Sequence, residues 1–239
     1  MQFILTDGVL AIKTYETLLM DLDDTLLDFR ANEHDALEIL FGTMKEPLDR
    51  EKRELYDKIN RRMWREYEEG KLAREELLNT RFRILFEHLG RRVDGAEAEA
   101  IYREALGRGA QLIEGALEVC QKLGEKYALH IVTNGTGETQ MKRLEASGLR
   151  KKVGKVFVSE LIGHSKPSRA FFDRVFSELR GTLPERALIV GDSLTSDVQG
   201  GINAGIDTCW FNPSGQTGNG KISATYEVRS LYELIPLLM

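Results

Sequence analysis

Short runs of consecutive hydrophobic residues recur along this chain and alternate with segments of helical periodicity. Runs rich in Val, Ile and Leu with few polar positions are typical of strands buried on both faces of a sheet. Between these runs, hydrophobic residues repeat every three or four positions in segments that end near glycine, as in helices. The alternation predicts a parallel, Rossmann-like α/β sheet. The expected strands are Thr17–Leu22, Ala128–Asn134, Lys155–Glu160, Ala187–Asp192 and Asp207–Asn212.

The segment from residue 31 to residue 110 interrupts this alternation, because it holds no convincing strand and is dense in Glu, Arg and Leu. Four stretches with hydrophobic residues at i, i+3 and i+4 predict consecutive helices. We therefore expect residues 1–30 and 111–239 to form the α/β core, and residues 31–110 to form an all-helical cap domain inserted after the first strand of that core. Open α/β sheets bind ligands at the carboxyl end of such a strand.

The amino-acid composition limits the classes of partner that this protein is expected to bind. The chain has 239 residues, of which 42% are hydrophobic and 30% charged, as in a globular protein. Its formal net charge of −5 argues against a basic surface for nucleic-acid polymers. No run approaches membrane-spanning length, and residues 1–13 lack the layout of a secretory signal, so they are expected as an extra strand or a frayed extension. Cys120 and Cys209 are predicted to be buried thiols, which fits a reducing cytoplasm.

Three aspartates, Asp21, Asp23 and Asp24, follow the first expected core strand. Like charges this close repel one another, so water, a metal ion or a catalytic task should offset the repulsion. On an extended backbone Asp21 and Asp23 share a face, while Asp24 turns away. One carboxylate could then attack a substrate or hold a metal while the other carries a proton. On this motif alone, an acidic turn that closes a strand is an equally good interpretation.

Other polar residues follow the later strands. Thr133 and Asn134 end the second expected core strand, where a hydroxyl and an amide can donate hydrogen bonds to phosphate oxygens, although Asn-Gly alone indicates a turn. Lys166 precedes a proline that is expected to open a helix, near a helix N-terminus that favours anions. An isolated surface lysine is the alternative. Asp192 ends a further strand, and Asp197 repeats a carboxylate five residues later.

Taken in this order, the motifs resemble those of the haloacid dehalogenase (HAD) superfamily, subfamily I, whose members are mostly phosphatases. The resemblance covers nearly all of the chain after about residue 14, and the helical insert matches the family's cap. The stretches DLDDTLLDF and GGINAGIDTCWFN look like those of the pyrimidine 5'-nucleotidase branch, which releases phosphate from nucleoside monophosphates such as dUMP and dTMP. The matching motif positions are Asp21, Asp23, Thr25, Thr133, Asn134, Lys166, Asp192 and Asp197.

This resemblance implies a mechanism. Asp21 would attack phosphorus and form an aspartyl-phosphate, while Asp23 would protonate the leaving oxygen and then activate water. Mg²⁺ would be held by the carboxylates of Asp21 and Asp192 and by the backbone carbonyl of Asp23. Lys166, the third catalytic residue, would lower the repulsion between the aspartates, and Asp197 would orient a metal-bound water or Lys166. Phosphate would be bound by Asp21, Leu22, Thr133, Asn134 and Lys166.

The expected partner is a small phosphorylated metabolite, a nucleoside monophosphate, and the expected protein is a cytoplasmic monomer or small homo-oligomer. A phosphoglycolate or sugar-phosphate phosphatase would share every core residue and differ in the cap. A 2-haloacid dehalogenase is disfavoured because it has no use for a proton carrier at Asp23. A non-catalytic binding scaffold is disfavoured because no catalytic position is missing, and a signalling receiver domain because its phosphorylated aspartate ends a middle strand.

One further stretch resembles a phosphate-binding motif but lacks two of its required features. The stretch GQTGNGKI, residues 215–222, nearly spells a phosphate-binding P-loop. However, Ile222 stands where a P-loop needs Ser or Thr, and the SATYEV that follows is strand-like where a P-loop needs a helix. We interpret this stretch as a flexible glycine-rich loop.

Overall fold

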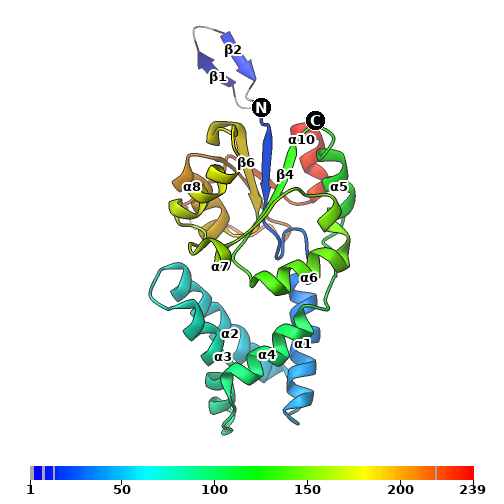
Figure 1. Cartoon of the computed structure of the whole chain (residues 1–239), viewed down its shortest axis with the longest axis vertical. Helices are drawn as coiled ribbons and strands as arrows, with labels where there is room; N and C mark the ends of the chain where they lie inside the picture. The colour runs from blue at the N-terminus through cyan, green and yellow to red at the C-terminus, as the bar shows by residue number, and fades with distance from the viewer. Residues whose placement is uncertain (1–2, 7–8, 13, 219) are drawn as a thin grey trace. The chain divides into compact units, whose positions relative to one another are not determined.

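The computed structural model of the chain describes residues 3–6, 9–12, 14–218 and 220–239. It divides into two compact units: residues 1–28 with 111–239, here called the sheet unit, and residues 29–110, here called the helical unit. Both are drawn in Figure 1. That the helical unit acts as a cap stays a prediction.

Six parallel strands form the sheet among the described residues, in the order β5-β4-β3-β6-β7-β8. This confirms the predicted α/β class. All five expected core strands are present, and the sixth strand, β8, lies in the strand-like stretch after the glycine-rich loop. The bounds are β3 (Thr17–Met20), β4 (Ala128–Thr133), β5 (Val156–Val158), β6 (Ala187–Gly191), β7 (Asp207–Phe211) and β8 (Tyr226–Val228).

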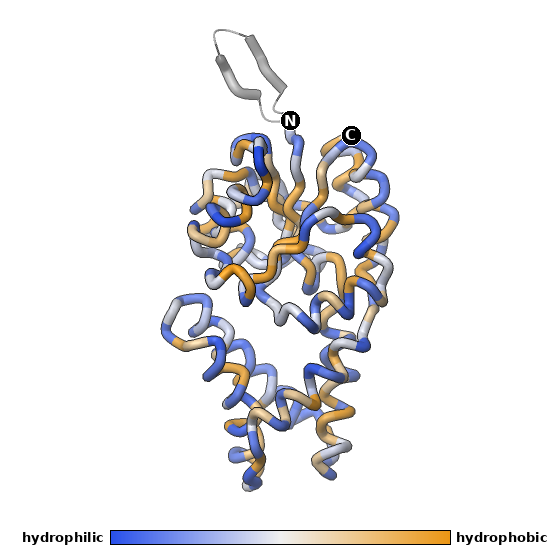
Figure 2. Tube along the Cα trace, viewed as in Figure 1, coloured by the Kyte–Doolittle hydropathy of each residue, from blue (hydrophilic) through white to orange (hydrophobic). Residues whose placement is uncertain are grey.

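The strand β3 lies between β4 and β6 and is buried on both faces. Its side chains alternate: Leu18 and Met20 belong to one hydrophobic cluster with residues of α5 (Ala116–Leu123), and Leu19 belongs to another with residues of α8 (Arg169–Glu178). Figure 2 shows the hydrophobic residues concentrated along these central strands. Burial on both faces explains why β3 reads as a continuous hydrophobic run.

Further helices connect the strands of the sheet unit. Helix α6 (Gly137–Ser147) ends at Gly148, whose φ of 79° lies in the left-handed region that glycine adopts without strain, as the sequence predicted. Cys120 and Cys209 are buried free thiols, also as predicted. The remaining elements are α7 (Ser159–Ile162), α9 (Gln199–Ala204), α10 (Leu234–Leu238), the 3₁₀ turns Leu149–Lys151, Pro184–Arg186 and Leu231–Glu233, and the π-helical turn η3 (Leu194–Val198).

The N-terminal stretch contains strands. The strands β1 (Phe3–Thr6) and β2 (Val9–Ile12) pair in antiparallel register. Of the two expectations for this stretch, extra strand structure is therefore the one observed, over the described residues.

The helical unit contains the four expected helices: α1 (Phe29–Thr43), α2 (Arg50–Glu68), α3 (Arg74–His88) and α4 (Gly95–Leu106). Side-chain caps fix two of their starts. Asp49 accepts a hydrogen bond from the backbone N–H of Lys52 at the start of α2, and Asp94 accepts from Ala96 and Glu97 at the start of α4. Helix α4 packs against α1 and α3 around a hydrophobic core.

A network of buried polar side chains runs through this core. The guanidinium of Arg81 donates two hydrogen bonds of 2.8 Å to the carboxylate of Glu99, and a third of 2.9 Å to Asn60. Asn60 and Tyr56 in turn donate to Glu33, at 3.4 and 2.9 Å. Since Arg81 and Glu99 are 3% and 2% exposed, each charge depends on the other for compensation.

We expect Arg81→Met to destabilise the protein by about 3–5 kcal/mol, because among the described residues Glu99 then keeps only Arg103, at 3.7 Å, for its buried charge. Chemical unfolding of the full chain, followed by circular dichroism, measures this. Arg83→Met is the matched control on the same helix: its exposed ion pair with Glu87 should contribute only about 0–1 kcal/mol. Equal losses in the two variants would contradict the expectation.

Candidate active site

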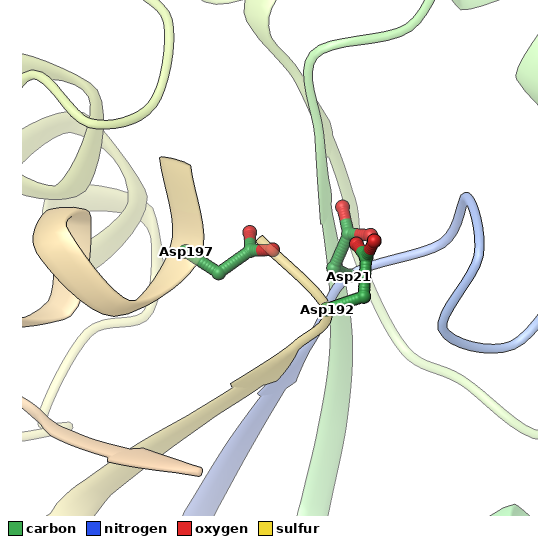
Figure 3. A group of neighbouring side chains, drawn as sticks. All are labelled: Asp21, Asp192 and Asp197. Carbon is green, nitrogen blue, oxygen red and sulfur yellow. The ribbon is translucent and has the colours of Figure 1, made fainter. Parts of the chain in front are cut away.

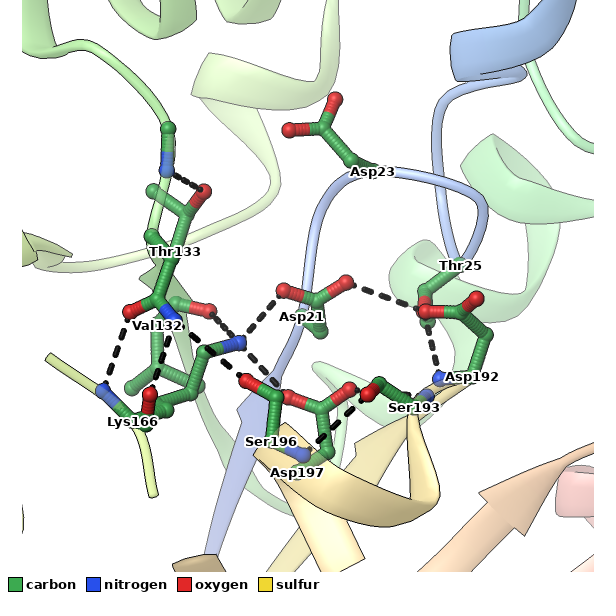
Figure 4. A network of polar contacts seen from close by, with 12 residues as sticks. Asp21, Asp23, Thr25, Val132, Thr133, Lys166, Asp192, Ser193, Ser196 and Asp197 are labelled. Carbon is green, nitrogen blue, oxygen red and sulfur yellow. Dashed lines mark hydrogen bonds and ion pairs between the residues drawn. The ribbon is translucent and has the colours of Figure 1, made fainter. Parts of the chain in front are cut away.

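The carboxyl ends of β3, β4 and β6 meet at one edge of the sheet and bring distant residues together. Met20 is in register with Ile131 of β4 and Val190 of β6. The next residue, Asp21, donates its backbone N–H to Val190 at 2.9 Å. Parallel register therefore places Asp21 beside Thr133, which ends β4, and Asp192, which follows β6 (Figure 4).

Three carboxylates gather at this edge. One oxygen from each of Asp21, Asp192 and Asp197 lies within 4.8 Å of the others (Figure 3). Burial, opposed by the charge of Lys166, raises the pKa of Asp21 to about 7. Burial and the neighbouring carboxylates raise the pKa of Asp192 well above its ordinary value. Both shifts have one cause: negative charges are held close together out of water.

One buried ammonium lies among these carboxylates. Lys166 is 2% exposed, and its Nζ donates to Asp21 at 2.6 Å, to Asp197 at 2.6 Å and to the carbonyl of Val132 at 2.9 Å. All three ammonium hydrogens are thus used. Burial alone would lower the pKa of Lys166, but the two carboxylates outweigh it and raise that pKa. With every group ionised, the cluster keeps a surplus of two negative charges, which suits a divalent cation.

Asp197 is tied into the protein through both oxygens. Its Oδ1 accepts from Lys166, and its Oδ2 accepts from the backbone N–H of Ser193 at 3.1 Å. A Cβ on Gly191 would lie 2.3 Å from Oδ2, so only glycine there lets Asp197 approach. That Asp197 orients Lys166, and that Asp21 and Asp192 hold the metal ion, stay predictions.

Thr25 connects the loop after β3 to Asp192, the residue that follows β6. Its hydroxyl donates to Asp21 Oδ2 at 3.2 Å and accepts from the backbone N–H of Asp192 at 3.1 Å. Thr25 is fully buried. Lys166 and Thr25 therefore fix one oxygen of Asp21 each.

Asp23 does not lie where an extended backbone would have put it. The strand β3 ends at Met20, and the chain reverses at Asp24, whose φ of 55° is in the left-handed region that Asp tolerates. Figure 4 shows the carboxylate of Asp23 turned away from Asp21. Instead it accepts a hydrogen bond of 2.6 Å from Gln140 and forms an ion pair with Arg143.

The predicted phosphate-binding residues differ in what they can offer. The Thr133 hydroxyl accepts from Gly135 N and from Gln140, at 3.1 and 2.9 Å, so its own hydrogen can be donated to an anion. The Asn134 amide is engaged elsewhere. It donates to the backbone carbonyl of Lys166 at 2.9 Å and accepts from the backbone N–H of Lys166 at 3.0 Å. It holds the Lys166 loop in place. The side chain of Leu22 is buried in the hydrophobic core, so only its backbone could contact a ligand.

Comparison with known proteins identifies the same family that these motifs indicate. A family profile described as haloacid dehalogenase-like hydrolase matches residues 15–205. The chain belongs to this family. It is therefore a hydrolase with a HAD-like fold, as the sequence motifs predicted.

Three relatives of this HAD-like hydrolase match nearly its full length. The HAD-hydrolase YfnB of Bacillus subtilis is 45% identical over 95% of this chain and 97% of that protein. Its magnesium-bound crystal structure superposes with a TM-score of 0.91 at 46% identity, covering 95% of this chain and 99% of the other. The pyrimidine 5'-nucleotidases PynA of Streptococcus pneumoniae and YjjG of Escherichia coli are 38% and 30% identical, over 94% of this chain and 95% and 98% of their own lengths.

No helix among the described residues is long and apolar enough to cross a membrane.

Three residues at this site had no role predicted from the sequence: Thr25, Gln140 and Arg143. Thr25 had a signal, its place in the first motif. Gln140 and Arg143 had none, because in the sequence they look like ordinary polar positions of a surface helix.

We expect the metal-free protein to lose stability, relative to Asp21→Asn, as pH rises from about 4 to about 7. The pKa of Asp21 is raised from 3.8 to about 7 in the folded state, so in this window the folded protein binds a proton that the unfolded chain has released. Its unfolding free energy falls by roughly 2–4 kcal/mol. Denaturant unfolding in EDTA at several pH values measures the difference.

Asp173→Asn provides the control, because Asp173 lies exposed on α8. Its stability should differ from that of the wild type by a constant small amount across this pH range. A parallel pH course for the wild type and Asp21→Asn would contradict the raised pKa.

Proposed function

We propose that this chain is a Mg²⁺-dependent phosphomonoesterase that releases phosphate from pyrimidine nucleoside 5'-monophosphates through an aspartyl-phosphate on Asp21. The placement of Asp21 carries the proposal: it lies 6% exposed at a strand end, with Lys166 on one oxygen and Thr25 on the other, beside Asp192. The names of the relatives PynA and YjjG support the pyrimidine nucleotide. The cytoplasmic location and the oligomeric state stay predictions.

The proposed reaction has two halves. In the first, an oxygen of Asp21 forms a bond to phosphorus, the bond from phosphorus to the ribose oxygen breaks, and the carboxyl of Asp23 gives its proton to that oxygen. In the second, Asp23 takes a proton from water, the water oxygen bonds to phosphorus, and the Asp21–phosphorus bond breaks. The charge of Lys166 and the hydroxyl of Thr133 stabilise the phosphoryl oxygens in both halves.

The residues at the site fit Mg²⁺. Oxygens of Asp21 and Asp192 lie close together. With the backbone carbonyl of Asp23, which the family resemblance implies as a third ligand, they would supply the all-oxygen donor set that hard divalent cations prefer. When bound, the cation supplies positive charge that offsets the repulsion between the nucleophile and the phosphate. Asp197, held by Lys166 and Ser193, orients Lys166.

We expect Mg²⁺ to bind about 10-fold more weakly at pH 6 than at pH 8, because protons compete for Asp21, whose pKa is about 7 without metal. Isothermal titration calorimetry with MgCl₂ at the two pH values tests this. Asp192→Asn should lose most of the binding, whereas the exposed Asp173→Asn should not change it. A pH-independent affinity, or full binding by Asp192→Asn, would contradict the assignment.

A phosphate-release panel tests the activity and the substrate together. We expect dUMP, dTMP and UMP to be hydrolysed faster than purine monophosphates, phosphoglycolate and hexose phosphates, and EDTA to abolish all release. Asp21→Asn should lower kcat by at least ~10³-fold, because the nucleophile is gone. Asp173→Asn is again the control.

The outcomes of the panel separate the two parts of the proposal. Preference for phosphoglycolate or a hexose phosphate would remove the nucleotidase assignment and leave the mechanism. Full activity in Asp21→Asn would remove the mechanism itself.

A further inference from the structure

Helix α6 directs two polar side chains into the protein interior. Gln140 and Arg143 are three residues apart, so they lie on the same face of the helix. They are 1% and 0% exposed. A long polar side chain and a charged one at these burial levels are rare unless specific partners hold them.

The partner of both is Asp23. Gln140 Nε2 donates to Asp23 Oδ2 at 2.6 Å, and Arg143 Nη1 forms an ion pair and hydrogen bond with Asp23 Oδ1. Arg143 Nη1 also donates to Gln140 Oε1 at 3.0 Å. Each oxygen of the Asp23 carboxylate is therefore held by a different residue of α6, and the two holders are bonded to each other. We call this pair, Gln140 and Arg143, the α6 clamp.

The clamp is also linked to the neighbouring strand end. Gln140 Nε2 donates to Thr133 Oγ1 at 2.9 Å as well, so one amide holds both Asp23 and a predicted phosphate-binding hydroxyl. The turn before α6 is shaped to admit it: a Cβ on Gly135 would lie 2.2 Å from Gln140 Nε2. These contacts link Gln140, and through it Asp23, to the strand end that carries Thr133.

We propose that Gln140 and Arg143 are positioning residues that act through Asp23 and fix where its carboxyl group exchanges protons with the substrate and with water. This inference rests on the proposed function, in which Asp23 is the proton carrier. Both clamp residues donate to Asp23 from the side of α6. The lone pairs on that side are thereby taken, so the proton of the carboxylic acid must lie on the side away from α6.

The experiment compares two phosphate esters by kcat/KM, which reports only the steps up to release of the leaving group. An alkyl leaving oxygen, as in dUMP, needs a proton from Asp23, whereas the nitrophenolate of p-nitrophenyl phosphate leaves without one. We expect Arg143→Met to lower kcat/KM for dUMP by about 10- to 100-fold and for p-nitrophenyl phosphate by less than about 3-fold. Arg143→Lys, which keeps the charge but loses the planar fork, should recover part of the loss.

Two further variants separate positioning from a general structural effect. Lys142→Met changes the neighbouring, exposed cation of α6 and should leave both kcat/KM values unchanged. In an Asp23→Asn background, Arg143→Met should cause no further loss toward dUMP, because the clamp then has no proton carrier to position. If Arg143→Met does not fold, Gln140→Met, which removes no charge, takes its place in the same comparison.

Equal losses for the two esters, or losses that multiply with that of Asp23→Asn, would overturn the inference. The wild-type panel judges the proposed function separately, since any alkyl phosphate that the wild type hydrolyses can replace dUMP. If the wild type hydrolyses no phosphate ester, the proposed function fails and the positioning role falls with it. The clamp contact itself is then tested by melting temperatures: the decreases caused by Asp23→Asn and Arg143→Met should be far from additive, and additive decreases would exclude the contact.

Discussion

The buried ammonium of Lys166 is the interaction on which the site depends. It lies between the carboxylates of Asp21 and Asp197 with all three of its hydrogens donated. Without it, three carboxylates within 4.8 Å of one another would repel strongly in a region from which water is largely excluded. With it, and with every group ionised, the cluster still carries a surplus of two negative charges. A fold that keeps such an imbalance is poised for a divalent cation and for a phosphoryl group that brings its own charge.

The chain contains a second buried ionic network, and the contrast between the two indicates which is functional. In the helical unit, Arg81 and Glu99 compensate each other through two 2.8 Å hydrogen bonds, and Asn60 and Tyr56 carry the network to Glu33. Its hydrogen bonds close within the unit, as expected of groups that serve packing and specificity. At the strand ends, by contrast, the charges do not balance and the Thr133 hydroxyl has a hydrogen to donate. Unbalanced charge together with an available donor marks a ligand site.

Parallel strand register turns these local features into one site. Because β3, β4 and β6 run side by side in the same direction, the residues at their carboxyl ends meet at one edge, although Asp21 lies 112 positions before Thr133 and 171 before Asp192 in the chain. A loop then adds Lys166, the turn η3 adds Asp197, and α6 adds Gln140 and Arg143. Similarity to HAD-hydrolase YfnB over nearly the whole chain shows that this architecture is shared.

The family, the sheet and the main carboxylates could be predicted from the sequence because their signals are local: hydrophobic runs that end in Asp or Thr need no partner to be recognised. It also predicted the four helices of residues 31–110 from their periodicity. The directions of the polar side chains, by contrast, follow from contacts that exist only in the folded chain. The end of β3 at Met20 turns Asp23 away from the face it would share with Asp21, the Asn134 amide is engaged by the Lys166 backbone, and Gln140 and Arg143 point inward. The physical reason is that hydrogen-bond partners far apart in sequence fix a side chain's direction, and periodicity carries no information about them.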